Sequence, residues 1–189
     1  MSTIGVNTPA MTVKLRALTS ADLDPVHALL SDWNVVRYML LPCCTTEDES
    51  RKCLHDLMTD SPGGAWQNVV RAIEFVDSGV VAGLCGIAVL HGSEQGEIWY
   101  LVRPDRWGQG IAQQAVRDLL KIGFLEMSLH RIFATCLPEN PASARVLEKI
   151  AMRKEGFQLK NLKIHGLWHD SFLYALLREE WDPTSRSAR

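Results

Sequence analysis

The most informative stretch of the sequence is Trp99-Tyr-Leu-Val-Arg-Pro-Asp-Arg-Trp-Gly-Gln-Gly-Ile-Ala112. Its apolar start is typical of a β-strand, and the spacing of Ile111, Ala115 and Leu119 indicates that an amphipathic helix follows. The two glycines between these elements let the main chain turn tightly. The stretch therefore predicts a strand that passes through a glycine-rich turn into a long helix.

The head of this helix has the features of an anion site. Its first N–H groups have no partner within the helix, the helix dipole favours negative charge there, and small residues allow close approach. A diphosphate is the natural occupant. A P-loop would need Gly-Lys-Ser/Thr, and a dinucleotide fingerprint would need a small residue where the chain has Gln113. The glycines alone are equally consistent with a turn that only shapes the chain.

The order of strand and helix signals along the rest of the chain predicts one domain of the mixed α/β or α+β class. Helix signals lie from Thr19 or Ser20 to Leu30, from Glu47 to Met58 after Thr45 and Thr46, from Ile111 to Phe124, and from Asn140-Pro141. Strand-like segments are Val13–Ala17, Gln67–Phe75, Val80–Leu90, Glu97–Val102, Arg131–Cys136, Arg153–Ile164 and Leu167–Leu177. Residues 60–64 form a loop by composition. We expect a single domain over residues 12–182, with flexible ends at 1–11 and 183–189.

Composition narrows the class of partner. The chain of 189 residues is 47% hydrophobic with a formal net charge of −2, which argues against disorder and against a nucleic-acid partner. No secretory signal is evident, and the apolar run Val80–Leu90 is too short to span a bilayer. Five cysteines without a C-x-x-C pair favour a reducing compartment. We therefore expect a cytoplasmic monomer or homodimer with no membrane partner.

Further motifs in the second half of the chain carry a family resemblance. They are Glu97-Ile-Trp-Tyr-Leu-Val102, Trp107-Gly-Gln-Gly-Ile-Ala112, Leu129-His-Arg-Ile132, Pro138-Glu-Asn-Pro-Ala-Ser143, Arg145-Val-Leu-Glu-Lys149, Glu155-Gly156 and Leu176-Leu-Arg-Glu-Glu-Trp181. This ordered set resembles the GCN5-related N-acetyltransferase (GNAT) superfamily, and within it the RimJ/RimL-type branch. The resemblance is weaker before Glu97, as in Val36-Arg-Tyr-Met39.

The resemblance implies a fold and a donor. The fold is a mostly antiparallel central sheet with about four flanking helices, whose fourth and fifth strands splay into a V-shaped cleft. Acetyl-CoA enters one side as acyl donor, without a metal, and the acceptor amine enters the other. The cofactor-binding residues implied in this way are Leu101, Val102, Arg103, Trp107, Gly108, Gln109, Gly110, Ile111, Ala112, Asn140 and Ser143.

The chain departs from the family pattern at three positions. Trp107 stands where the superfamily motif usually has Gln or Arg, and Gln114 stands where this branch often has Glu. Trp99 replaces a residue that is frequently small, which would reshape the acceptor pocket. We expect Tyr38, Trp66, Trp99 and Trp168 as candidate walls of that pocket, each of which is also suited to ordinary packing.

Acyl transfer to an amine needs a base for the ammonium proton and a donor for the leaving thiolate. Glu97 is the preferred base because it shares a strand face with Trp99 and Leu101, and Glu126 and Glu139 are alternatives. Asn140 is suited to cap a helix through the Ser143 N–H. The resemblance adds a contact of Asn140 with pantetheine and of Ser143 with the sulfur, so both join Glu97 in the predicted catalytic set.

The sequence thus predicts an acetyl-CoA-dependent N-acetyltransferase. The acetyl group would pass to a primary amine, on a small molecule or a protein N-terminus, by direct attack in a ternary complex. A non-catalytic acyl-CoA sensor and a nucleotide-binding domain are the alternatives. The first would bind coenzyme A without turnover, and the second would bind ATP or NAD without competition by coenzyme A.

Overall fold

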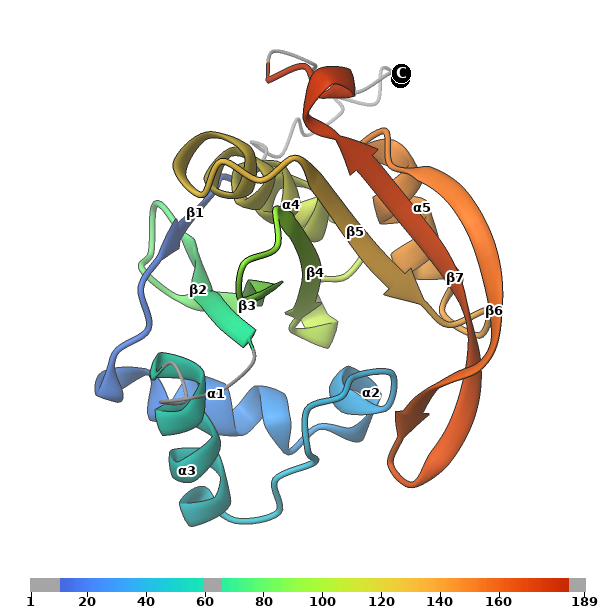
Figure 1. Cartoon of the computed structure of the whole chain (residues 1–189). Helices are drawn as coiled ribbons and strands as arrows, with labels where there is room; N and C mark the ends of the chain where they lie inside the picture. Colours follow the sequence, from blue (N-terminus) through green and yellow to red (C-terminus); the bar gives the residue numbers. More distant parts are fainter. Residues whose placement is uncertain (1–10, 60–65, 184–189) are drawn as a thin grey trace, which may run out of the picture.

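The computed structural model describes residues 11–59 and 66–183 (Figure 1). The side chains of Trp66 and Leu90 lie outside this description, as do the predicted loop 60–64 and nearly all of both predicted flexible ends. The described chain is organised around one seven-stranded sheet with the order β1-β2-β3-β4-β5-β7-β6. The strands are β1 (Val13–Arg16), β2 (Trp66–Phe75), β3 (Val81–Leu90), β4 (Gln95–Val102), β5 (Arg131–Cys136), β6 (Arg153–Ile164) and β7 (Leu167–Leu177).

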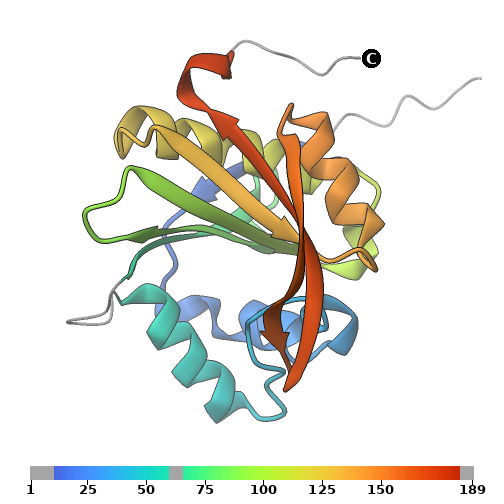
Figure 2. The same cartoon turned by 45° about the vertical axis from the view of Figure 1, so that its right-hand side comes forward.

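Helices cover the two faces of this sheet in separate layers (Figure 2). One face carries α1 (Leu23–Leu30), α2 (Trp33–Val36) and α3 (Glu47–Met58), whose apolar side chains meet Leu84 and Leu101 in one core cluster. The other face carries α4 (Ile111–Lys121) and α5 (Pro141–Lys149), packed in a larger cluster around Ile132 and Tyr174. The sequence prediction of a mixed fold with a mostly antiparallel sheet is confirmed.

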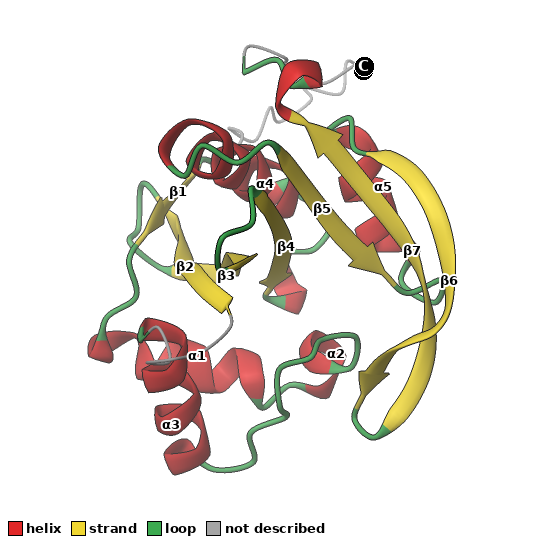
Figure 3. Ribbon diagram, viewed as in Figure 1, coloured by secondary structure: helices red, strands yellow, loops and turns green. Residues whose placement is uncertain are grey.

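The sheet changes character between β4 and β5. All other neighbouring strands pair antiparallel, whereas β4 and β5 are parallel and pair only through Gln95↔Arg131, Gly96↔Ile132 and Glu97↔Phe133. Beyond Glu97, β4 continues to Val102 with β3 as its partner. The two strands therefore diverge in the middle of the sheet, as the yellow arrows of Figure 3 show.

Local capping explains where two helices begin. Thr46 accepts a hydrogen bond from the Glu49 N–H (3.3 Å), and the Glu49 carboxylate accepts one from the Thr46 N–H (3.1 Å). This reciprocal capping box starts α3 at Glu47, as predicted. Asn140 caps α5 through the Ser143 N–H (3.2 Å), which is also the predicted contact.

Two helical features were not predicted. The single turn α2 begins where Asp32 accepts a hydrogen bond from the Asn34 N–H (2.9 Å), and four residues are too few to give a helical period. In addition, α4 ends at Lys121 and continues as the π-helix η3 (Ile122–Glu126) rather than as a regular helix to Phe124. Gly123 lies so close to the sheet there that a Cβ atom would approach Ile132 Cδ1 to 2.5 Å.

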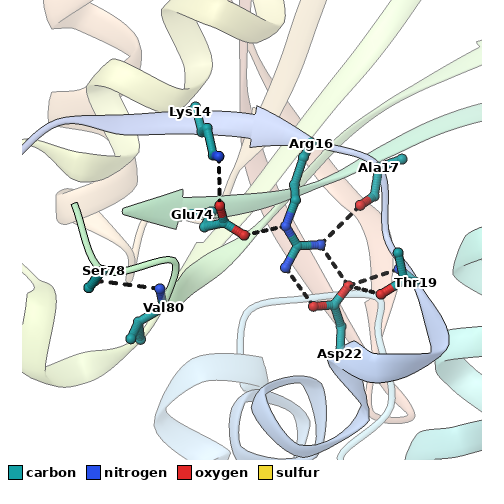
Figure 4. A network of polar contacts seen from close by, with 8 residues as sticks. All are labelled: Lys14, Arg16, Ala17, Thr19, Asp22, Glu74, Ser78 and Val80. Carbon is teal, nitrogen blue, oxygen red and sulfur yellow. Dashed lines mark hydrogen bonds and ion pairs between the residues drawn. The ribbon is translucent and has the colours of Figure 1, made fainter. Parts of the chain in front are cut away.

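A network of charged groups joins β1, β2 and the start of α1 (Figure 4). Arg16 makes a bidentate ion pair with Asp22 (2.7 and 2.8 Å) and a second pair with Glu74, which also binds Lys14 (2.9 Å). Asp22 is only 4% exposed. The network therefore fixes the layer of α1–α3 against the edge of the sheet. Among the described helices, none is long and apolar enough to cross a membrane.

Candidate active site

The diverging part of β4 leaves one strand edge open. Arg103 donates its N–H to the carbonyl of Ala82, so the main-chain groups of Arg103 face the β3 side (2.9 Å). Because successive residues of a strand direct these groups to opposite edges, those of Val102 and Tyr100 face the open side. The Val102 carbonyl there accepts a hydrogen bond from the Trp107 indole N–H (2.7 Å). The open edge thus begins at the split and ends where Trp107 closes it.

The glycine turn, residues 107–110, leads from this edge into α4. Gly108 (φ 75°) and Gly110 (φ 79°) both have left-handed backbone conformations that favour glycine, and a Cβ atom on either would meet nothing within 4 Å. Within the described chain, no hydrogen bond satisfies the main-chain N–H groups of residues 108–112, and the first helical bond runs from Gln114 to Gly110 (3.0 Å). A row of free donors therefore lies at the positive end of the helix dipole.

The start of α5 faces the same edge. Asn140 fixes the Ser143 N–H, and the Ser143 Oγ atom lies 2.8 Å from the Tyr100 hydroxyl of β4. Burial raises the pKa of Tyr100 well above its usual value, so its hydroxyl keeps its proton. Sequence reasoning missed Tyr100 because its partner lies 43 residues away, although strand periodicity places it on the α4/α5 face.

Glu97 lies at the point of the split, on the opposite face of the sheet. Its Oε1 atom accepts a hydrogen bond from the Thr135 hydroxyl (2.7 Å), which holds the carboxylate between β4 and β5. Both side chains line a hollow of about 370 Å³, which we call the central hollow. Its wall is formed by Gln95, Glu97, Arg131, Phe133, Thr135, Gln158, Asn161, Leu162 and Leu173.

The two alternative bases lie elsewhere. Glu126 belongs to η3 and lines a separate hollow of about 310 Å³ beside His91, and Glu139 is exposed in the loop before α5. Neither residue contributes to the wall of the central hollow. Of the predicted bases, Glu97 is therefore the one that combines the split of the sheet with an accessible cavity.

Of the predicted aromatic walls, Tyr38, Trp99 and Trp168 do not line the central hollow. The Trp99 indole lies over Gly86 of β3, where a Cβ atom would come within 2.8 Å of the ring. The bulky indole therefore fits because Gly86 has no side chain. Tyr38 packs beneath the Arg37 guanidinium (4.7 Å), and Trp168 on β7 is 56% exposed. The side chain of Trp66 is outside the described residues.

A contact between α2 and the β6–β7 turn closes one end of the region. The His165 ring lies 4.7 Å from that of Trp33, and its Nε2 atom is 3.1 Å from the Val36 carbonyl oxygen. The chain segments that carry Tyr38 and Trp168 therefore approach each other on the face of the central hollow, where the β6–β7 hairpin reaches toward α2 (Figure 1).

The polar groups along the open edge suit a diphosphate-containing thioester. Among the described residues, no cluster of three His, Cys, Asp or Glu side chains is arranged to hold a metal ion. All five cysteines are free, and burial raises the pKa of Cys53 to about 11.

Gln114 accepts a hydrogen bond from the Val13 N–H, so this departure from the family pattern serves the packing of α4 on β1. An open strand edge that ends in a row of free N–H donors fits an acyl-CoA.

Comparisons with known proteins agree with this geometry. Residues 12–153 match the acetyltransferase (GNAT) domain family. The N-acetyltransferase YnaD of Bacillus subtilis is 33% identical over 89% of this chain and 95% of its own length. A GNAT-family acetyltransferase structure from Bacillus anthracis superposes with a TM-score of 0.78 at 33% identity, covering 90% of this chain and 98% of that chain. RimJ of Mycobacterium smegmatis, solved with CoA-disulfide, superposes with a TM-score of 0.78 at 27% identity, covering 95% and 87%.

The chain belongs to the GNAT acetyltransferase family. It is an N-acetyltransferase that uses acetyl-CoA as its acyl donor and an amine as its acceptor. The predicted superfamily and its RimJ-like relatives are thereby confirmed, and the sensor alternative is not favoured.

Proposed function

We propose that this enzyme acetylates a primary amine by direct attack within a ternary complex, with the donor on the open edge of β4 and the acceptor in the central hollow. The observation that carries the proposal is the parting of β4 and β5 after Glu97. The gap joins the α4/α5 face, which has the free N–H donors, to the opposite face, which has the carboxylate.

Each proposed role follows from the position of a residue. The main-chain N–H groups of residues 108–112 bind the diphosphate, and the open edge of β4, with the main-chain groups of Tyr100 and Val102, pairs with the pantetheine arm. The main-chain groups of Leu101 and Arg103, which the family resemblance also implies for this contact, point to β3 instead. Trp107 contributes by fixing the turn to that edge. Asn140 and Ser143, at the head of α5, orient the arm near its sulfur. These groups hold the thioester in place, and proximity supplies much of the rate because a thioester is already activated.

Glu97 is the proposed general base. An alkylammonium has a pKa near 10, so most of the acceptor is protonated at neutral pH and must lose a proton before attack. The Thr135 hydroxyl donates to one carboxylate oxygen of Glu97, and the other oxygen accepts no hydrogen bond from any described residue. That oxygen can accept the proton directly or through one water molecule.

The charges in the wall of the central hollow indicate which class of amine can bind there. It contains one carboxylate, Glu97, together with the amides of Gln95, Gln158 and Asn161 and the guanidinium of Arg131, which pairs with Glu155 (2.6 Å). A polyamine would bring further positive charges that this wall does not neutralise. We therefore propose a monoamine that carries neutral hydrogen-bonding groups near the ammonium, as in a small molecule or a protein N-terminus.

The remaining expectations concern the whole chain. We infer that residues 12–182 act as one catalytic domain in the cytoplasm, as a monomer or homodimer. One sheet runs from Val13 to Leu177, and free thiols are suited to a reducing compartment.

Release of coenzyme A in the presence of a panel of amines tests the proposal. We expect thiol release with monoamines such as amino-acid amides and short peptides, and weaker release with spermidine at equal concentration. Mass spectrometry of the product should show acetylation of the amine. Binding of acetyl-CoA without release for every amine would contradict the proposal and favour a sensor.

A further inference from the structure

The hydroxyl of Tyr100 has two acceptors and one proton. Its Oη atom lies 2.8 Å from Ser143 Oγ and 3.2 Å from the Ser143 carbonyl oxygen. If Tyr100 donates to the carbonyl, the Ser143 hydroxyl must donate to Tyr100. If Tyr100 donates to Ser143 Oγ, the Ser143 proton is free for a third partner. The pair therefore has two hydrogen-bond arrangements that need only rotation of the two hydroxyls.

The main chain fixes the place of Ser143 in this pair. Its N–H is held by the cap residue Asn140 (3.2 Å) in the first turn of α5, and its side chain is half-buried. Tyr100 comes from the part of β4 that has separated from β5. The Cys136 thiol also lies beside the Ser143 hydroxyl, but it donates to the main-chain carbonyls of Leu137 and Asn140 (3.5 Å each). The proposed function places the pantetheine arm on the open edge of β4, where its sulfur can be the third partner.

We propose that Tyr100 is a positioning residue that makes Ser143 a hydrogen-bond donor to the departing sulfur of coenzyme A. This inference rests on the proposed function. In the resting arrangement the Ser143 hydroxyl is turned to Tyr100. As negative charge develops on the sulfur, the Ser143 O–H turns to it and the Tyr100 O–H turns to Ser143 Oγ, so that two donors in series stabilise the thiolate.

The pair stabilises the thiolate by hydrogen bonding and keeps its own protons. Burial raises the pKa of the Tyr100 hydroxyl, whereas an ordinary thiol titrates near 8.5. A thiolate is therefore too weak a base to take the proton of Tyr100. The thiolate gains its proton from water or from the acceptor nitrogen, which loses its second proton after attack as the C–S bond breaks. The serine–tyrosine pair lowers the pKa of the bound thiol.

Titration of the coenzyme A thiol in the binary complex measures this effect without turnover. The ultraviolet absorbance of the thiolate is followed against pH, with the complex of desulfo-coenzyme A as the blank for the protein's own thiols. We expect a bound-thiol pKa below that of free coenzyme A in the wild type. Tyr100→Phe and Ser143→Ala should each raise it by about one unit, a tenfold change of the size expected for a hydrogen bond to a charged group.

Tyr174→Phe provides the matched control. Tyr174 also joins a strand to α5 through a buried hydroxyl, which donates to Glu148 (3.2 Å) rather than to Ser143. It should leave the thiol pKa at the wild-type value. An unchanged pKa in Tyr100→Phe, or an equal rise in Tyr174→Phe, would overturn the inference. Failure of the wild type to bind coenzyme A would instead contradict the proposed function.

Discussion

The indole N–H of Trp107 donates a hydrogen bond of 2.7 Å to the carbonyl oxygen of Val102, the last residue of β4. The bond joins the start of the glycine turn to the strand edge that precedes it. Trp107 thereby sets the distance between the proposed pantetheine edge and the proposed diphosphate site. The aromatic residue at this position, a departure from the superfamily pattern, thus has a structural function.

Loss of this hydrogen bond should weaken donor binding. Trp107→Phe keeps an aromatic ring at a 49% exposed position and removes the N–H donor together with part of the indole. We expect the affinity for acetyl-CoA to fall by about fivefold, which corresponds to about 1 kcal/mol, a typical net hydrogen-bond contribution. Calorimetric titration measures it. Trp33→Phe, at a 51% exposed position on α2, is the control and should bind as the wild type. Equal affinities for all three proteins would refute the role of Trp107.

A side chain at Gly110 should block the diphosphate. Gly110→Val places methyl groups in open space beside the free N–H donors and imposes a left-handed backbone (φ 79°) on a β-branched residue. We expect acetyl-CoA binding to weaken by more than about tenfold, together with a stability loss of about 1–2 kcal/mol from the backbone alone.

Gly79→Val separates these two effects. Gly79, in the turn between β2 and β3, has a similar backbone (φ 70°) and equally open surroundings. It should show the stability loss in thermal unfolding and retain wild-type affinity for acetyl-CoA. If Gly110→Val also retained that affinity, the diphosphate would not bind at the glycine turn.

Local signals explain what the sequence could predict. The caps at Thr46 and Asn140 and the glycines of the turn depend on residues within a few positions, so their patterns are readable in one dimension. Pairs such as Glu97 with Thr135 and Tyr100 with Ser143 join residues about forty positions apart. Periodicity assigns each of these side chains to a face of the sheet but does not identify its partner.

The split of the sheet was likewise not readable from the strands themselves. The segments Glu97–Val102 and Arg131–Cys136 both have strand composition, and nothing in either shows that pairing stops after Glu97. The family resemblance supplied that feature. The helix α2 escaped prediction because its single turn depends on the cap of Asp32 rather than on a repeating pattern.

Glu97→Gln should lower turnover at neutral pH and partly recover as the pH rises. The amide cannot accept the ammonium proton, whereas a higher pH supplies more of the neutral amine without a base. The pH profile of kcat/KM measures this. Thr135→Val removes the hydrogen bond to Glu97 but keeps the carboxylate, so its loss of turnover should be smaller. A profile of Glu97→Gln that matches the wild type would exclude Glu97 as the base.

Acid should weaken the Arg16 network. The Arg16 guanidinium lowers the pKa of the Asp22 and Glu74 carboxyls below their usual values. Because these pKa values are lower in the folded state than in the unfolded state, the ionised carboxylates stabilise the fold. This stabilisation is complete above the pKa of the unfolded state, near 4, and is lost as the pH falls through the pKa of the folded state. Asp22→Asn should cost about 1–3 kcal/mol at neutral pH and reduce the acid-dependent loss.

Urea unfolding across the acid range tests this prediction. Asp48→Asn is the control. The Asp48 side chain is 97% exposed and its ion pair with Arg51 is long (4.0 Å), so the substitution should have a small effect. If Asp22→Asn had the same free energy of unfolding as the wild type at every pH, the network would not stabilise the fold.

A crystal structure of the acetyl-CoA complex tests the central claim most directly. We expect oxygens of the diphosphate to lie at hydrogen-bond distance, about 2.7–3.2 Å, from main-chain nitrogens of residues 108–112, with the thioester at the gap between β4 and β5. A diphosphate bound elsewhere, or these N–H groups bonded to the protein itself while acetyl-CoA is bound, would contradict the account.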